Sequence, residues 1–310
     1  MSAPPQPTPP PRDRQLSWIE RVFLGNDANM RPIYKVVLFV IAVFLLNIEV
    51  GSIVFTYTRN LPLRYQFLWN SLALVIAFLL LSWLFLRVAD GRKFSALGLT
   101  FRRGWGRELS LGFALGVTLQ LLVMATLVAT LSVHYSAGDI INLHFLRQSA
   151  ELTALFALAA AVEEFSFRGY AFQRLIDAVG APAALVASSV LFGLGHLGNP
   201  SATLFSTLNT ILAGLLLGLP YVRTRSMWMQ IGLHWSWNLT MAILVSLPVS
   251  GITFAPSLLT ARESGPAWLT GAHYGPEGGA VVTIVSIAAI AWLLRTRHLT
   301  PSPAAPEDLQ

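Results

Sequence analysis

The sequence predicts an all-α membrane protein, a polytopic transmembrane bundle of about eight helices that encloses a polar cavity. Two features of the composition support this fold class: 54% of the 310 residues are hydrophobic and only 12% are charged, where globular domains carry about 25% charged residues. The third observation is a series of apolar runs, each close to the roughly 20 residues that cross a bilayer. Together these spans fill the chain and leave no room for a large soluble domain.

The helices follow one another along most of the chain. They are expected at 33–57, 66–87, 109–133, 150–176, 181–197, 203–222, 227–248 and 280–294. Residues 249–279 are rich in Gly and Pro, which predicts an outer loop or a re-entrant turn. Residues 31–298 would form the transmembrane domain, between a disordered or interfacial tail at 1–30 and a disordered tail at 299–310.

The basic residues predict an orientation rather than a nucleic-acid partner, although the net charge is +6. They gather at the ends of apolar runs, and with the N-terminus inside, fifteen lie in inner segments: Arg12, Arg14, Arg21, Arg31, Lys35, Arg87, Arg92, Lys93, Arg102, Arg103, Arg107, Arg223, Arg225, Arg295 and Arg297. The outer segments hold only Arg59, Arg64, Arg147 and Arg262. The positive-inside rule therefore predicts an integral membrane protein with both termini in the cytoplasm, in a bacterial inner membrane.

Three ionisable residues interrupt the apolar segment 152–170: Glu163, Glu164 and Arg168. A charge at the centre of a membrane helix costs about 2.5–3.5 kcal/mol, so charges that remain there need partners or a function. Glu164 and Arg168 are four residues apart and share a helix face, which predicts a supporting salt bridge. Glu163 lies about 100° around the helix and has no local cation, so it is the candidate for chemistry.

Two later helices carry polar residues at the same spacing. Phe192 and His196 are four apart in one helix, and His234 and Asn238 are four apart in another. Exposure to lipid would be costly, so these side chains are expected to face the bundle interior and to meet Glu163 in one cavity.

This set of residues resembles that of a hydrolase. A carboxylate beside imidazoles can activate water, and an amide donor such as Asn238 can stabilise the oxyanion formed when water adds to a peptide carbonyl. Glu163, His196 and His234 could instead bind zinc, if they converge within about 2.0–2.2 Å of one point. No cofactor is certain. The chain has no cysteine, which excludes a thiolate nucleophile and cysteine-ligated zinc.

Other interpretations of the same residues remain. A lone His or Asn in a membrane helix often forms an interhelical hydrogen bond, and Glu49 in the first span marks either a second function or a site near the outer interface. The cavity could bind a peptide without cutting it, as in an immunity or scaffold protein. A proton-coupled transporter is a third hypothesis, but the sequence shows no internal repeat to support it.

With these motifs the chain resembles the CAAX protease and bacteriocin-processing family of intramembrane endopeptidases, which includes the type II CAAX prenyl endopeptidases. The family pattern Glu-Glu-x-x-x-Arg matches Glu163, Glu164 and Arg168. Phe-x-x-x-His matches Phe192 and His196, and His-x-x-x-Asn matches His234 and Asn238. The likeness covers a protease-like core at about 150–245.

The resemblance implies catalytic roles for four of these residues. Glu163 and His196 would activate water, while His234 and Asn238 would hold the oxyanion. Glu164 and Arg168 would brace the site. The implied partner is a peptide or membrane-protein substrate in the bilayer: a prenylated protein, a leader peptide or another membrane protein. The sequence does not indicate an oligomeric state.

Overall fold

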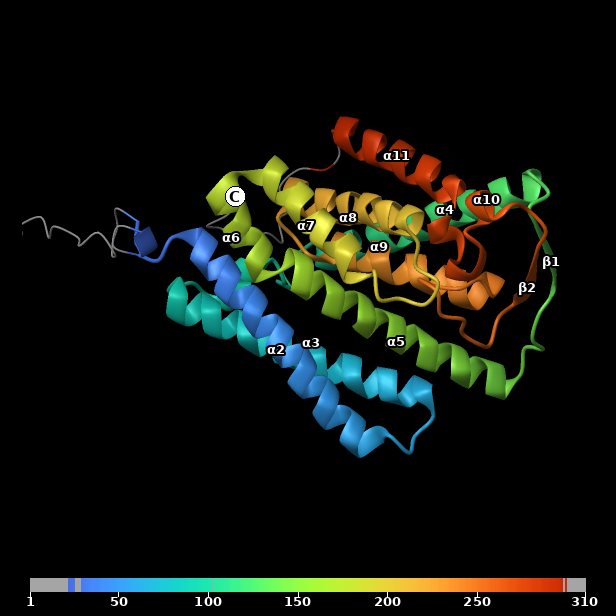
Figure 1. Ribbon diagram of the computed structural model, residues 1–310, viewed down its shortest axis with the longest axis horizontal. Helices are drawn as coiled ribbons and strands as arrows, with labels where there is room; N and C mark the ends of the chain where they lie inside the picture. Colours follow the sequence, from blue (N-terminus) through green and yellow to red (C-terminus); the bar gives the residue numbers. More distant parts are fainter. Residues whose placement is uncertain (1–21, 26–28, 102, 298, 300–310) are drawn as a thin grey trace, which may run out of the picture.

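The computed structural model describes residues 22–25, 29–101, 103–297 and 299, which form an all-α bundle with one small two-stranded sheet (Figure 1). The longer helices are α2 (Pro32–Thr58), α3 (Leu63–Ala89), α4 (Trp105–Ala129), α5 (Leu143–Arg168), α6 (Tyr170–Val179), α7 (Ala181–Gly195), α8 (Leu204–Thr224), α9 (Trp228–Leu239) and α11 (Ala280–Arg295). Within the described residues, five segments are long and apolar enough to cross a membrane: α2, α3, α4, α5 together with α6, and α8. The chain is thus an integral membrane protein.

The helices pack around α5, which runs diagonally through the molecule in Figure 1. Helices α2 and α3 lie on one side of it, and α7, α8, α9 and α11 lie on the other. Helix α4 packs along α9. This arrangement brings α5, α7 and α9, which carry the three motifs, next to a common space.

Glycine allows α4 and α9 to pack very closely. A Cβ atom at Gly112 of α4 would collide with the Met229 carbonyl of α9, and one at Gly116 would collide with the Leu233 carbonyl. From the other side, a Cβ at Gly232 would collide with the Leu109 carbonyl. Small residues four apart are a common way for membrane helices to approach each other, and here they fix the helix that carries His234.

Two of the eight expected helices are each divided into two elements. The helix expected at 150–176 is interrupted at Gly169, where the backbone leaves the helical region (ψ −133°) and a Cβ would collide with the Phe165 carbonyl. It therefore forms α5 and α6. The helix expected at 227–248 ends as an α-helix at Leu239 and continues as a π-helical turn, Thr240–Leu244. Such turns interrupt regular α-helical geometry and often lie near functional sites.

The two-stranded sheet was not predicted. β1 (Val133–Ala137) pairs antiparallel with β2 (Leu259–Glu263), so the helix expected to reach residue 133 ends at Ala129 instead. The shorter elements are η1 (Phe94–Leu97), α10 (Ala267–Thr270), η3 (Ala272–Tyr274) and η4 (Pro276–Gly278). The strands pair residues more than 120 positions apart, and each covers only five residues, too few for a clear alternating pattern.

The segment between the π-helical turn and α11, residues 246–279, contains β2, α10, η3 and η4 and packs closely on itself and on the residues before α8. Its glycines allow close backbone contacts: a Cβ at Gly275 would collide with the Pro248 carbonyl, and one at Gly251 would collide with the Pro200 carbonyl. We call this segment the α9–α11 connection. The terminal tails expected at 1–30 and 299–310 lie mostly outside the described residues.

Candidate active site

A cavity of about 410 Å³ lies where the three motif-bearing helices meet. Helix α5 contributes one wall, α7, α8 and α9 contribute the others, and the α9–α11 connection covers one end. Side chains from α2 and α3 also reach it, namely Asn47, Phe67 and Ser71. Most of the remaining lining is apolar, so the few polar groups in it define where a polar ligand can bind.

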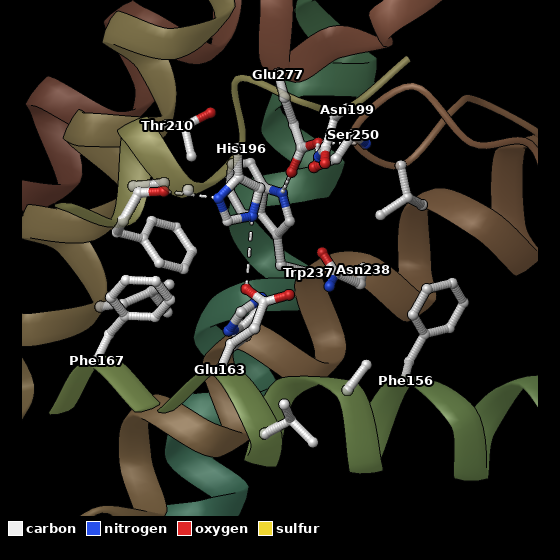
Figure 2. Close-up of a pocket in the computed structure, with 18 of the residues that line it drawn as sticks. Phe156, Glu163, Phe167, His196, Asn199, Thr210, Trp237, Asn238, Ser250 and Glu277 are labelled. Atoms are coloured by element: carbon white, nitrogen blue, oxygen red, sulfur yellow. Dashed lines mark hydrogen bonds and ion pairs between the residues drawn. The ribbon is translucent and has the colours of Figure 1, made fainter. Parts of the chain in front are cut away.

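The carboxylate of Glu163 lies between two imidazoles in this cavity. Its Oε2 atom is 3.6 Å from Nε2 of His196 and also 3.6 Å from Nε2 of His234. Figure 2 shows Glu163 rising from α5 beneath the ring of His196. These distances exceed those of a good direct hydrogen bond, and Oε2 has no hydrogen-bond partner among the described residues. The cluster therefore has donor and acceptor capacity left for a ligand.

His196 is oriented by the motif that contains it. The residue lies just after the end of α7, and its Nδ1 is 2.7 Å from the carbonyl oxygen of Phe192, one helical turn earlier. A carbonyl only accepts hydrogen bonds, so Nδ1 carries the hydrogen and Nε2 is directed at Glu163. The ring of Phe192 also packs against the imidazole, with the centroids 4.5 Å apart. The Phe-x-x-x-His spacing thus fixes both the tautomer and the direction of the ring.

His234 is oriented by the second glutamate. Its Nδ1 donates to Oε1 of Glu164 at 2.8 Å, which turns its Nε2 towards Glu163. The two adjacent glutamates therefore differ in position: Glu163 lines the cavity, while Glu164 is fully buried behind His234. A buried carboxylate that holds an imidazole in this way is common around reactive histidines.

Arg168 completes the buried group. Its Nη1 is 3.2 Å from Oε1 of Glu164, which confirms the predicted (i, i+4) ion pair. Its Nη2 donates to the Gly214 carbonyl of α8, and its guanidinium lies 4.3 Å from the centroid of the Phe192 ring in α7. With only 1% of Arg168 exposed, this one side chain connects α5, α7 and α8 beneath the cavity.

Asn238 lies one turn after His234 in α9 and lines the same cavity (Figure 2). Within the described part of the chain its carboxamide forms no side-chain hydrogen bond, whereas the buried Asn209 uses its amide group fully, in contacts with Glu277, Gly279 and Thr283. The Asn238 amide is therefore available to a ligand.

All four residues predicted to be catalytic thus line one cavity, while Glu49 does not. Glu49 is exposed on α2 and is absent from the cavity lining.

The described residues present no ready-made zinc site. Zinc ligands lie about 2.0–2.2 Å from the metal and are usually four in number, with at least three from the protein. Among the described residues, no three His, Asp or Glu side chains, including Glu163, His196 and His234, are grouped so that they could hold a metal ion. We therefore derive no reaction step through a metal.

The sequence analysis missed a further carboxylate in the cavity, that of Glu277 in η4. Its Oε1 accepts a hydrogen bond from Trp237 Nε1 at 3.0 Å, and its Oε2 accepts from the Ser250 backbone N–H and Oγ at 2.7 and 2.8 Å. The only signal for it was one acid inside a Gly- and Pro-rich stretch, HYGPEGG, which a loop in solvent would also explain.

One comparison with known proteins found a match. The family model described as "Type II CAAX prenyl endopeptidase Rce1-like" matches residues 146–240, which run from the first turn of α5 to the end of α9 and contain all three motifs. Searches of curated proteins and of solved structures found no match. Over this region the chain is similar to type II CAAX prenyl endopeptidases, as the motifs predicted.

Proposed function

We propose that this protein is an intramembrane endopeptidase, which hydrolyses a peptide bond of a membrane-associated protein or peptide with water activated by Glu163. The observation that carries the proposal is the position of Glu163 Oε2, 3.6 Å from Nε2 of both His196 and His234 in an internal cavity. A water molecule can lie about 2.8 Å from Oε2 and from a ring nitrogen at the same time. That water would be oriented for attack on a bound carbonyl.

In the first step, the water oxygen forms a bond with the carbonyl carbon of the peptide. His196, whose Nε2 faces the cavity as an acceptor, orients the water, and Glu163 takes one of its protons. The carbonyl oxygen becomes an oxyanion, which accepts a hydrogen bond from the Asn238 amide and another from His234. His234 donates as an imidazolium, with Nδ1 bonded to Glu164 and Nε2 directed into the cavity.

In the second step, the carbon–nitrogen bond breaks and the proton held by Glu163 passes to the leaving amine. The first products are a carboxylic acid and an amine, which exchange a proton to become a carboxylate and an ammonium ion, and Glu163 returns to its starting form. The apolar walls around the site keep other water away, which strengthens each of these electrostatic interactions.

Glu164 and Arg168 have a supporting role in this proposal. Glu164 holds His234, and Arg168 holds Glu164 while it connects three helices. Neither side chain lines the cavity.

The proposed setting is a bacterial cytoplasmic membrane with both termini inside, so that cleavage occurs within or near the inner leaflet. Fifteen basic residues in the inner segments against four in the outer ones support this orientation. The transmembrane domain would span 31–298, with the protease core at about 150–245. The match to CAAX endopeptidases supports the reaction class and a peptide substrate. Leader peptides and other membrane proteins contain the same peptide bond and are the other proposed substrates.

The experiment incubates the purified full-length protein with a library of membrane-anchored peptides in nanodiscs and identifies products by mass spectrometry. We expect cleavage by the wild type and by Glu49→Gln, a matched control at an intramembrane acid outside the cavity, but not by a correctly folded Glu163→Gln. Tight peptide binding with no product from the wild type would instead support the non-catalytic scaffold function. Full activity of Glu163→Gln would refute the assignment of the base.

A further inference from the structure

The carboxylate of Glu277 takes no part in the water-activating group, yet it faces the same cavity. We propose that Glu277 binds a cationic side chain of the substrate beside the bond that is cut, so that the cavity selects peptides with Lys or Arg at that position. The inference rests on the proposed function and adds the class of substrate.

Glu277 is held in place from three elements. Its carboxylate accepts hydrogen bonds from Trp237 of α9 and from Ser250 of the α9–α11 connection. Its backbone carbonyl accepts one from Asn209 of α8 at 2.8 Å, and Thr283 of α11 in turn fixes Asn209 at 2.6 Å. A carboxylate fixed in this way is preorganised for a ligand, because binding requires no further ordering of the side chain.

Among the described residues no ion pair balances the charge of this carboxylate; His196 interacts with it electrostatically, but at more than ion-pair distance. All its hydrogen-bond donors are neutral, and no Lys, Arg or His in the described part of the chain forms an ion pair with it. A charge taken out of water is costly unless it is paired. A cation from the substrate would supply the missing partner.

The cavity as a whole is electronegative. Its described lining contains two carboxylates, Glu163 and Glu277, and no Lys or Arg, so it keeps a net negative charge even with His234 as an imidazolium. The buried arginine nearby, Arg168, is already paired with Glu164. A narrow cavity with apolar walls concentrates the field of such charges, so it attracts cationic groups and disfavours anionic ones.

The position of Glu277 fits contact with a residue next to the cleaved bond. Figure 2 places Glu277 and Glu163 on opposite sides of His196, with Trp237 and Asn238 between them on α9. A peptide whose carbonyl lies at Glu163 and Asn238 would therefore extend a neighbouring side chain towards Glu277. The apolar lining suits the methylene stem of Lys or Arg, which packs on apolar surface while its charged end finds the carboxylate.

A simpler role for Glu277 would be to anchor the α9–α11 connection. That role depends on the hydrogen bonds to Trp237 and Ser250 and not on the negative charge. Two substitutions separate these roles: Glu277→Gln keeps the shape but removes the charge and one of the two accepting oxygens, whereas Ser250→Ala also removes one hydrogen bond to the carboxylate but keeps the charge.

The test compares kcat/KM for matched peptides that carry Lys, Gln or Glu at each position flanking the cleaved bond. At one position we expect the wild type to prefer Lys over Gln by about 10- to 100-fold, as a desolvated charge pair would give, and to cleave the Glu peptide most slowly. Glu277→Gln should reduce the preference to near unity, and Ser250→Ala should retain it. Equal rates for Lys and Gln at every position, or a preference that Glu277→Gln leaves unchanged, would overturn the inference.

A binding measurement covers the case in which Glu277→Gln does not fold. Full-length Glu163→Gln in nanodiscs is titrated with the same fluorescent Lys and Glu peptides at low and high salt. Tighter binding of the Lys peptide that weakens with salt supports the inference, and equal affinities contradict it. If the wild type binds the Lys peptide selectively but does not cleave it, the proposed endopeptidase activity is refuted and this inference is not. If cleavage depends on Glu163 but does not change with the charge of the peptide, only this inference is refuted.

Discussion

Replacement of Arg168 by Met is expected to destabilise the protein strongly, although Arg168 lies outside the cavity. The substitution keeps an apolar stem of similar length but removes the guanidinium. It leaves Glu164, which is fully buried, with His234 as its remaining partner, and it removes the hydrogen bond to the Gly214 carbonyl. The change therefore removes the connection between three helices and half of a buried ion pair.

The magnitude follows from that burial. Removing one partner of a buried ion pair costs about 3–5 kcal/mol, mainly because the other charge is left uncompensated. The double variant Glu164→Gln/Arg168→Met removes both charges and should be less destabilised than the sum of the two single variants. The coupling between two groups in direct contact is expected to be about 1–3 kcal/mol.

The assay is reversible unfolding of the purified protein in mixed micelles by added SDS, followed by tryptophan fluorescence. Arg147→Met is the matched control, because Arg147 forms an (i, i+4) pair with Glu151 on the same helix but is 68% exposed. Its substitution should shift the unfolding midpoint much less than Arg168→Met does.

Equal shifts for Arg147→Met and Arg168→Met would refute the reasoning. So would additive losses from Glu164→Gln and Arg168→Met, since independent losses would mean that the two charges do not stabilise each other.

Three further outcomes are expected. Gly116→Val should separate α4 from α9, because the valine side chain would meet the Leu233 carbonyl. We expect the unfolding free energy to fall by about 1–3 kcal/mol and activity to be lost, and an unchanged melting curve would contradict this. Asn238→Ala should lower kcat by about 10²–10³-fold with little change in stability, as the loss of one oxyanion donor does, and an unchanged kcat would remove Asn238 from the site. Activity should survive exhaustive chelation, since Glu163, His196 and His234 do not form a metal-binding group; loss of activity that zinc restores would contradict this expectation.

The sequence was informative in the membrane helices, where a polar side chain exposed to lipid is costly. In an apolar helix every polar residue stands out, so Glu163, His196, His234 and Asn238 could be identified and assigned to one interior before their distances were known. The spacing of Glu164 and Arg168 predicted their ion pair because (i, i+4) neighbours on a helix must lie close together.

The sequence was less informative where the structure depends on contacts between distant segments. The break at Gly169 depends on a close backbone contact with Phe165 that a side chain would prevent, and the pairing of β1 with β2 joins strands more than 120 residues apart in the chain. Glu277 could not be assigned to the site either, since its position depends on contacts of its loop with distant residues, such as the close packing of Gly251 on Pro200 and the hydrogen bond to Trp237. The hydrogen bond between Glu164 and His234 was also not predicted, because it depends on how α5 and α9 face each other.

The most direct test of the mechanism is a comparison of kcat for Glu163→Gln, His196→Ala and the double variant on one cleaved peptide. If residues from α5 and α7 act on a single water molecule, each single substitution should lower kcat by about 10²–10⁴-fold, and the double variant should lose little more than Glu163→Gln alone. Losses that multiply in the double variant would show that the two residues act independently, and the proposed water-activating site would be wrong.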